Sequence, residues 1–162
     1  MKVLVLSSRT GRALHMLNDI YPIHAAVSAT NVPRGILAIE TPRTKEQWEK
    51  ILSMYFDVVI SLGFMKHIPR TIFENVPTLN VHPGKLPDFK GRDPHIQALR
   101  AKVDYTAVTI HKVIEELDSG EVVVEVPVRI SSLDYPAQRF EDRLRHIAVL
   151  ATAAFLYGLE GR

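Results

Sequence analysis

The sequence predicts one α/β domain over residues 1–162, with a mainly parallel, twisted sheet, helices on both faces and antiparallel strands added near the C-terminus. Three observations support this fold class. A chain of 162 residues with 46% hydrophobic composition has the size of one compact domain. Short apolar runs alternate with helical spacings through the first half of the chain. Two longer runs that alternate apolar and polar residues follow in the second half.

The first predicted elements are a strand, a turn and a helix. Val3 to Leu6 is a β-branched and leucine run that indicates a strand. A small and basic turn follows from Ser7 to Arg12. Apolar residues then recur at helical spacing, at Leu14, Leu17 and Ile20.

Two further short strands are predicted at Ala25 to Ala29 and at Ile36 to Ile39. They are separated by the segment Asn31 to Arg34, which is too short to hold a crossover helix. We therefore expect one connection of this sheet to be unusually abbreviated.

The middle of the chain predicts another helix and two more strands. Thr44 can cap a helix whose apolar side chains fall on one face, at Trp48, Ile51, Leu52 and Tyr55. Val58 to Ile60 and Leu79 to His82 follow as strands, and the second of these stops at Pro83 and Gly84. Ligands of open parallel sheets bind at the carboxyl ends of the strands, so this strand tip is a candidate site.

The last third of the chain predicts a short helix, two strands and a long helix. The turn Gly91 to Pro94 precedes the short helix, which carries Ile96, Ala98 and Leu99. Tyr105 to Val113 and Val122 to Ile130 alternate as strands do. Gln138 to Leu159 forms a long helix with one apolar stripe, made of Phe140, Leu144, Ile147, Ala151, Phe155 and Leu159.

Composition and charge exclude several classes of site. The 20 lysines and arginines nearly balance the 18 acidic residues, and neither sign forms a long run, so we expect no nucleic-acid or membrane surface. No segment is apolar enough to span a membrane, and a cytoplasmic location is expected. The absence of cysteine excludes disulfides and thiolate metal ligands, and the histidines lack metal-ligand spacing, so no metal is expected. The oligomeric state stays open, a homodimer included.

Three polar residues form a candidate catalytic set. Asn80 and His82 are two apart in a predicted strand, so their side chains leave the same face, and Asp118 lies in an acidic turn that can fold back over the strand tip. An amide, an imidazole and a carboxylate suit acyl transfer to an amine, in which the carbonyl oxygen gains negative charge and the nitrogen positive charge. In this interpretation Asp118 raises the basicity of His82. The alternatives are a turn cap, a half-buried histidine and a turn aspartate.

The motifs around these residues resemble those of the folate-dependent formyltransferase family. The first is Asn80-Val81-His82-Pro83 with Leu86-Pro87 and Phe89-Lys90-Gly91 after it. The segment Ser61 to Lys66 and the turn Glu116 to Gly120 resemble the folate-pocket segment and aspartate loop of glycinamide ribonucleotide transformylases, the most similar branch. The resemblance implies a Rossmann-like formyltransferase fold and 10-formyltetrahydrofolate as formyl donor.

The resemblance also implies roles for individual residues. Asn80 and His82 are expected to polarise the formyl group while Asp118 assists proton transfer. The residues expected to hold the folate are Gly63, Phe64, Met65, Lys66, His67, Ile68, Glu116 and Leu117. The residues expected to contact the amine substrate are Arg9, Gly11, Arg12, Pro83, Gly84 and Lys85. His111 either faces the cleft near Asp118 or lies on the sheet surface.

The function predicted is transfer of a formyl group to a primary amine, with glycinamide ribonucleotide as the leading acceptor, which places the reaction in one-carbon metabolism and purine biosynthesis. The first turn lacks the family's Ser-Asn pair, and its two arginines either hold an anion by charge-assisted bonds instead or are solvated at the surface. The turn Gly91 to Pro94 resembles one in some amino-sugar formyltransferases. Three alternatives stay open: an amino-sugar N-formyltransferase, a 10-formyltetrahydrofolate hydrolase and a non-catalytic folate-binding protein. A Rossmann dehydrogenase is disfavoured because no G-x-G-x-x-G turn is present.

Overall fold

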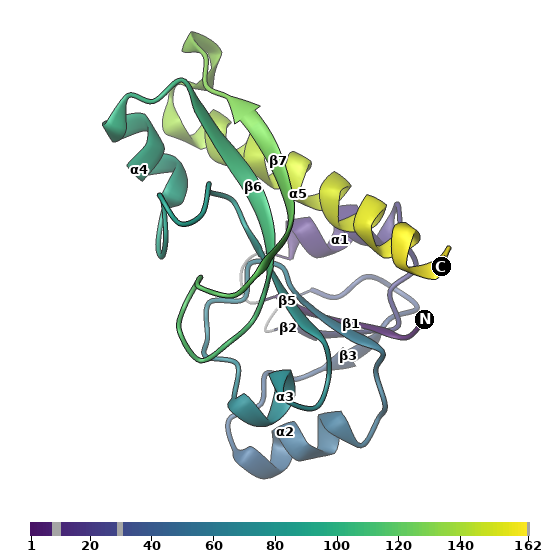
Figure 1. The fold of residues 1–162 in the computed structure, drawn as a ribbon. Helices are drawn as coiled ribbons and strands as arrows, with labels where there is room; N and C mark the ends of the chain where they lie inside the picture. Colours follow the sequence, from purple (N-terminus) through teal and green to yellow (C-terminus); the bar gives the residue numbers. More distant parts are fainter. Residues whose placement is uncertain (8–10, 29–30, 162) are drawn as a thin grey trace.

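The computed structural model describes residues 1–7, 11–28 and 31–161, which form one seven-stranded sheet with helices on both faces (Figure 1). The strands are β1 (Val3–Ser7), β2 (Ala25–Ser28), β3 (Leu37–Ile39), β4 (Val58–Ser61), β5 (Thr78–His82), β6 (Tyr105–Lys112) and β7 (Val122–Arg129). The helices are α1 (Arg12–Asn18), α2 (Lys45–Leu52), α3 (Arg70–Phe73), α4 (Pro94–Ala101), the 3₁₀ turn η1 (Ser132–Asp134) and α5 (Ala137–Glu160).

The sheet has a parallel part and an antiparallel part, as the sequence predicts. Its strand order is β3-β2-β1-β4-β5-β6-β7, and the first five strands in this order pair in parallel. β6 and β7 add to β5 as antiparallel strands. The predicted fold class is therefore confirmed. Because β4 and β5 are parallel neighbours, Ser61 pairs with Asn80 and both strands end at the same edge.

Two apolar cores, one on each face, hold the helices to the sheet. The larger core joins α1, α4 and α5 to the sheet and includes the fully buried Leu14, Phe140 and Leu144. The smaller core lies on the opposite face, where Trp48 and Ile72 attach α2 and α3 (Figure 1). Short apolar strands buried on both faces require this double cover.

The abbreviated connection between β2 and β3 is confirmed. The two strands pair in parallel, with Ala25 opposite Leu37, and no helix occurs in the described residues that connect them. Most parallel pairs are joined by a crossover helix, so this edge of the sheet lacks one layer of cover. Residues 29 and 30, which include the predicted end of the first of these strands, lie outside the described residues.

The predicted start of α2 is confirmed, but its end is not. Thr44 and Gln47 form a reciprocal capping box at the N-terminus of the helix. The expectation that Tyr55 packs on the apolar face is wrong, because the helix stops at Leu52 and Tyr55 has a left-handed φ of 54° and is 81% exposed. Ile20 likewise lies beyond α1, which ends at Asn18, and is 40% exposed.

The buried face of α5 differs from the predicted stripe in its second half. Phe140 and Leu144 are buried as predicted. The predicted positions Ile147, Ala151, Phe155 and Leu159 are only partly buried, whereas the fully covered positions are Ala148, Val149, Thr152, Ala153 and Leu156. The buried face is rotated because α5 packs against α1 as well as against the sheet. No helix among the described residues has the length and apolarity that a membrane crossing requires.

Candidate active site

Strands β5 and β6 bring three polar side chains to one face of the sheet. Asn80 and His82 project from the end of β5, as their spacing predicts, and His82 is only 5% exposed. β6 runs antiparallel to β5 in a register that sets His111 opposite Asn80. The sequence left the position of His111 open, and the structure places it in the site, 2% exposed, with its Nε2 3.1 Å from Asn80 Nδ2.

Asp118 folds back over the strand tip from the connection between β6 and β7. Its carboxylate Oδ1 accepts a hydrogen bond from Asn80 Nδ2 at 3.4 Å and lies 3.4 Å from His111 Nε2. Its other oxygen, Oδ2, lies 3.6 Å from His82 Nδ1. The backbone N–H of Gly91 donates to the same oxygen at 2.8 Å. We call Asn80, His82, His111 and Asp118 the catalytic cluster; a single carboxylate connects its members.

The carboxylate of Asp118 is ionised in this environment. Burial alone raises the pKa of a carboxyl group. For Asp118 burial is outweighed by the hydrogen bonds from His111 and Gly91 and by the two neighbouring imidazoles, so its pKa is lowered from the ordinary 3.8.

His82 behaves differently from the sequence-based expectation. Asp118 does favour the charged imidazole, as predicted, and so does the carbonyl of Phe89, which lies 2.6 Å from His82 Nε2. Burial has the larger effect, and it lowers the pKa of His82 from the ordinary 6.5. The net basicity of His82 is therefore reduced, and the imidazole is neutral at neutral pH.

The two imidazoles are held in defined orientations by main-chain carbonyls. His82 Nε2 points at the Phe89 carbonyl, which can only accept, so this nitrogen carries a hydrogen and Nδ1 faces Asp118. His111 Nδ1 lies 3.0 Å from the carbonyl of Lys112, which leaves its Nε2 toward Asn80 and Asp118. Each ring thus turns one nitrogen toward the carboxylate.

A cavity of about 620 Å³ opens over the catalytic cluster. All the residues predicted to hold the folate line it: Gly63, Phe64, Met65, Lys66, His67, Ile68, Glu116 and Leu117. Met65 and Leu117 are 52% and 73% exposed, so they present apolar surface at the cavity wall. Phe64 is buried, and its ring packs edge-on against Trp48 at 6.3 Å, so it belongs to the smaller core as well as to the wall.

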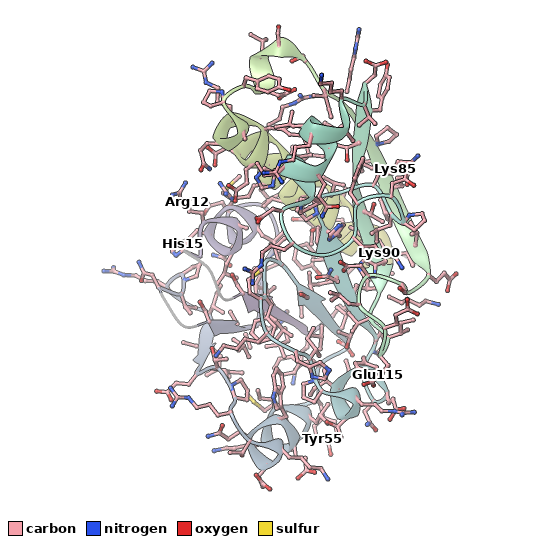
Figure 2. All side chains as sticks on the ribbon, turned by 90° about the vertical axis from the view of Figure 1, so that its left-hand side faces the viewer. Arg12, His15, Tyr55, Lys85, Lys90 and Glu115 are labelled. Carbon is pink, nitrogen blue, oxygen red and sulfur yellow. The ribbon has the colours of Figure 1, made fainter. Side chains whose placement is uncertain are left out.

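The residues predicted to contact the amine substrate divide into three groups. Gly11, Arg12 and Pro83 line the cavity. Gly84 and Lys85 do not: Lys85 Nζ pairs with Asp88 at 3.0 Å, and Gly84 packs behind the imidazole of His82. Arg9 lies outside the described residues. Arg12 lies on one side of the face shown in Figure 2, and Lys90 and Glu115 lie on the other.

The chemistry available here is proton handling and charge stabilisation. Across residues 1–7, 11–28 and 31–161 no three His, Cys, Asp or Glu side chains are grouped to hold a metal ion. The catalytic cluster instead combines amide and imidazole donors with one carboxylate, and both imidazoles and the carboxylate are buried. Such a site favours reactions in which a carbonyl oxygen becomes negative while a proton leaves a nitrogen.

Comparisons with known proteins find matches in sequence and in structure. A family model described as formyl transferase matches residues 3–154. The chain is 28% identical over 142 residues to a methionyl-tRNA formyltransferase of Geobacillus sp. (strain WCH70), covering 74% of this chain and 44% of that protein. It is 29% identical over 148 residues to the methionyl-tRNA formyltransferase of Bacillus cytotoxicus, covering 78% and 47%. The chain thus spans about half the length of these curated relatives, or less.

Solved structures show the same fold over nearly the whole chain. A phosphoribosylglycinamide formyltransferase from Streptococcus pneumoniae superposes with a TM-score of 0.83 at 24% identity and covers 98% of both chains. One from Anaplasma phagocytophilum superposes with a TM-score of 0.80 at 25% identity, over 93% of this chain and 82% of that one.

Proposed function

Because this chain belongs to the formyl transferase family, we propose that it is an enzyme that transfers a formyl group from 10-formyltetrahydrofolate to a primary amine. We propose glycinamide ribonucleotide as the acceptor, and therefore a role in purine biosynthesis in the cytoplasm. The observation that carries the proposal is the catalytic cluster, with His82, His111 and Asp118 buried and Asn80 partly buried, in the lining of a cavity that every residue predicted to bind folate also lines. We also propose that residues 1–162 act as one catalytic domain.

The cavity suits a flat folate ring. Met65 and Leu117 present exposed apolar side chains. Gly63 leaves the main chain accessible, because it has a left-handed φ of 72° and a β-carbon added there would meet nothing within 4 Å beyond its chain neighbours. Apolar walls with backbone hydrogen-bonding groups between them are typical of sites for planar heterocycles. When bound, the folate supplies the formyl carbon that the amine attacks.

Asn80 is positioned to stabilise the negative charge that develops on the formyl oxygen. Its Nδ2 donates to Asp118 Oδ1 at 3.4 Å and lies 3.1 Å from His111 Nε2. In our proposal the amide exchanges its bond to Asp118 for one to the oxyanion. A donor held by its neighbours needs little reorganisation during the reaction, and this is the main advantage of such sites.

His82 is positioned to receive the proton that the amine loses. Its neutral ring already donates from Nε2 to the Phe89 carbonyl, so the free lone pair is on Nδ1. A proton taken up at Nδ1 lies beside Asp118 Oδ2, 3.6 Å away, and the resulting imidazolium has a partner for each N–H. Asp118 thus stabilises the charged product of proton transfer and keeps both rings aligned. When the bond between the formyl carbon and the donor nitrogen breaks, the proton passes to that nitrogen, and His82 returns to its neutral form.

The position of Arg12 supports the proposal of an anionic acceptor. Arg12 lines the cavity at the first turn of α1, its side chain is 64% exposed, and Nη1 is 4.0 Å from Asp142. A guanidinium with this much exposed surface can form charge-assisted hydrogen bonds to a phosphate group. This favours a phosphorylated acceptor such as glycinamide ribonucleotide.

Tetrahydrofolate release from 10-formyltetrahydrofolate, followed optically, tests the proposed function. The acceptors to compare are glycinamide ribonucleotide, methionyl-tRNA, a nucleotide-linked amino sugar and none. Release that requires glycinamide ribonucleotide supports the proposal. Release that requires methionyl-tRNA overturns the acceptor and the prediction that no nucleic acid binds, while acceptor-independent release indicates a hydrolase. Folate binding without release under every condition overturns the catalytic role.

A further inference from the structure

A four-residue segment, Phe89 to Arg92, connects the two titratable partners of the proton-transfer step. We call it the strap; it lies between β5 and α4. At one end of the strap, the carbonyl of Phe89 accepts from His82 Nε2 at 2.6 Å. In its middle, the N–H of Gly91 donates to Asp118 Oδ2 at 2.8 Å. Both contacts come from main-chain atoms, so the path of the strap sets the position of His82 and Asp118 together.

Gln97 of α4 holds the strap through its main chain, in addition to the bond from Lys90 Nζ to Ser119 Oγ at 2.6 Å. Gln97 Nε2 donates to the carbonyl of Lys90 at 2.8 Å and to the carbonyl of Arg92 at 2.9 Å. Gln97 is partly buried and is absent from the residues that line the cavity. It therefore touches the strap from the side opposite to the reacting groups.

Peptide geometry links these contacts. The carbonyl of Lys90 and the N–H of Gly91 belong to the same peptide group, which is planar and trans, so they point in opposite directions. A hydrogen bond that fixes the Lys90 carbonyl therefore also fixes the direction of the Gly91 N–H. Gln97 on one side and Asp118 on the other hold the two ends of this single peptide group.

We propose that Gln97 is a positioning residue, which aims the Gly91 N–H at Asp118 through the Lys90–Gly91 peptide group and so holds the carboxylate against His82 and His111. The inference rests on the proposed function for its kinetic consequence, but the geometry it describes is independent of the acceptor. Without the amide of Gln97 the peptide group is held at its Gly91 N–H end only, next to a glycine that permits many backbone conformations. Gly91 has a left-handed φ of 78°. A strap that followed a different path would not require this φ.

The test is Gln97→Glu, which keeps the length and shape of the side chain but replaces the donor with an acceptor that faces two carbonyls. We expect kcat to fall about tenfold while KM for the folate donor changes less than about twofold, because proton handling is impaired and contact area is not. We also expect the acid limb of the kcat/KM profile to move to higher pH, since the Asp118 carboxylate loses a donor that favours its ionised form.

Two further variants and a control separate positioning from a structural role. Gln97→Met removes the donor without adding charge and serves if the glutamate variant does not fold. Gln97→Lys retains an N–H donor at similar reach and is expected to recover most of the lost kcat. Asn75→Asp removes a comparable amide-to-carbonyl bond, from Asn75 Nδ2 to Thr71 at 2.8 Å, outside the cavity lining, and is expected to leave kcat unchanged.

A readout that needs no turnover keeps this inference distinguishable from the proposed function. The imidazole nitrogens of His82 are titrated by NMR in the unaltered protein and in Gln97→Glu. A changed titration of this ring supports the inference even if no acceptor is found. Unchanged titration curves, or a loss of kcat that Gln97→Lys does not recover, overturn it.

Discussion

The two sides of the cavity differ in how tightly their functional groups are held. On the β5 and β6 side, His82, His111 and Asp118 are each less than 9% exposed, and both imidazoles contact the carboxylate of Asp118. On the α1 side, Arg12 is mostly exposed, and its only described ion-pair contact is at 4.0 Å. Burial and mutual bonding favour a fixed geometry for chemistry, whereas a solvated arginine adapts to what binds. The comparison predicts that substitutions on the first side change turnover and those on the second change acceptor binding.

The largest effect is expected for Asp118→Asn. Loss of the carboxylate removes the partner that stabilises a charged His82, so turnover is expected to fall by about 10²-fold or more, with folate affinity nearly unchanged. Turnover and equilibrium folate binding are measured on the same samples. Asp104→Asn, at an exposed position before β6, is the matched control. An equal loss of folate affinity in the Asp118 variant contradicts its assignment to chemistry.

A second substitution on the β5 and β6 side acts through packing. A β-carbon at Gly84 lies 2.9 Å from His82 Nε2, 2.6 Å from Pro94 Cβ and 3.0 Å from the Phe89 carbonyl, so Gly84→Ala must displace the imidazole or the strap. We expect kcat to fall about tenfold or more. Gly158→Ala in α5 is the control, because nothing lies within 4 Å of its β-carbon and alanine favours a helix by about 0.5–1 kcal/mol. Full activity in Gly84→Ala contradicts this prediction, because it shows that the imidazole or the strap can move without loss of turnover.

On the α1 side, Arg12→Gln is expected to act on acceptor binding alone. Removing one charge-assisted contact to a phosphate raises KM for glycinamide ribonucleotide about tenfold, with kcat and folate KM little changed. Steady-state kinetics with each substrate varied in turn provide the measurement. The control is Arg100→Gln, at an exposed position of α4. A fall in kcat without a change in KM removes the proposed division between the two sides.

The smallest effect, a displaced pH profile, concerns His82 in the unaltered protein. To accept a proton His82 must be neutral, and its pKa is lowered from 6.5, chiefly by burial. Activity is therefore kept as the pH falls through the ordinary histidine range and is lost only below it. The same sign holds for Asp118, whose pKa is also lowered. A kcat/KM profile over about pH 4 to 9 measures this, and an acid limb above the ordinary histidine pKa of about 6.5 contradicts a buried, neutral His82.

Sequence reasoning succeeded where a residue's position depends on local periodicity. The spacing of Asn80 and His82 within one strand placed them on one face, and the helix cap at Thr44 was correct. It was incomplete where position depends on pairing between strands. His111 joins the site only because the antiparallel register of β6 sets it opposite Asn80, and neither strand alone encodes that register.

The remaining differences arise from tertiary packing and from loop paths. Tyr55 continues the helical spacing in the sequence, but the helix ends at Leu52 and the chain turns away. The second half of α5 is buried on a rotated face because α1 packs beside it. The contact of Gln97 with the strap depends on the path of a loop, for which sequence patterns carry little information. The assigned roles of Gly84 and Lys85 in substrate binding stay predictions, and neither residue lines the cavity.

The use of main-chain atoms in the strap has a consequence for how this site tolerates sequence change. The partners of His82 and Asp118 are a carbonyl and an N–H that every non-proline residue possesses, so both bonds remain when the Lys90 side chain changes, and only its contacts with Ser119 and Glu116 are lost. Gly91 and Gly84 cannot vary in the same way, since one has a left-handed φ of 78° and the other has no room for a β-carbon. A saturation library across residues 83–94 is therefore expected to show tolerance at Lys90 between two intolerant glycines, a pattern set by the backbone.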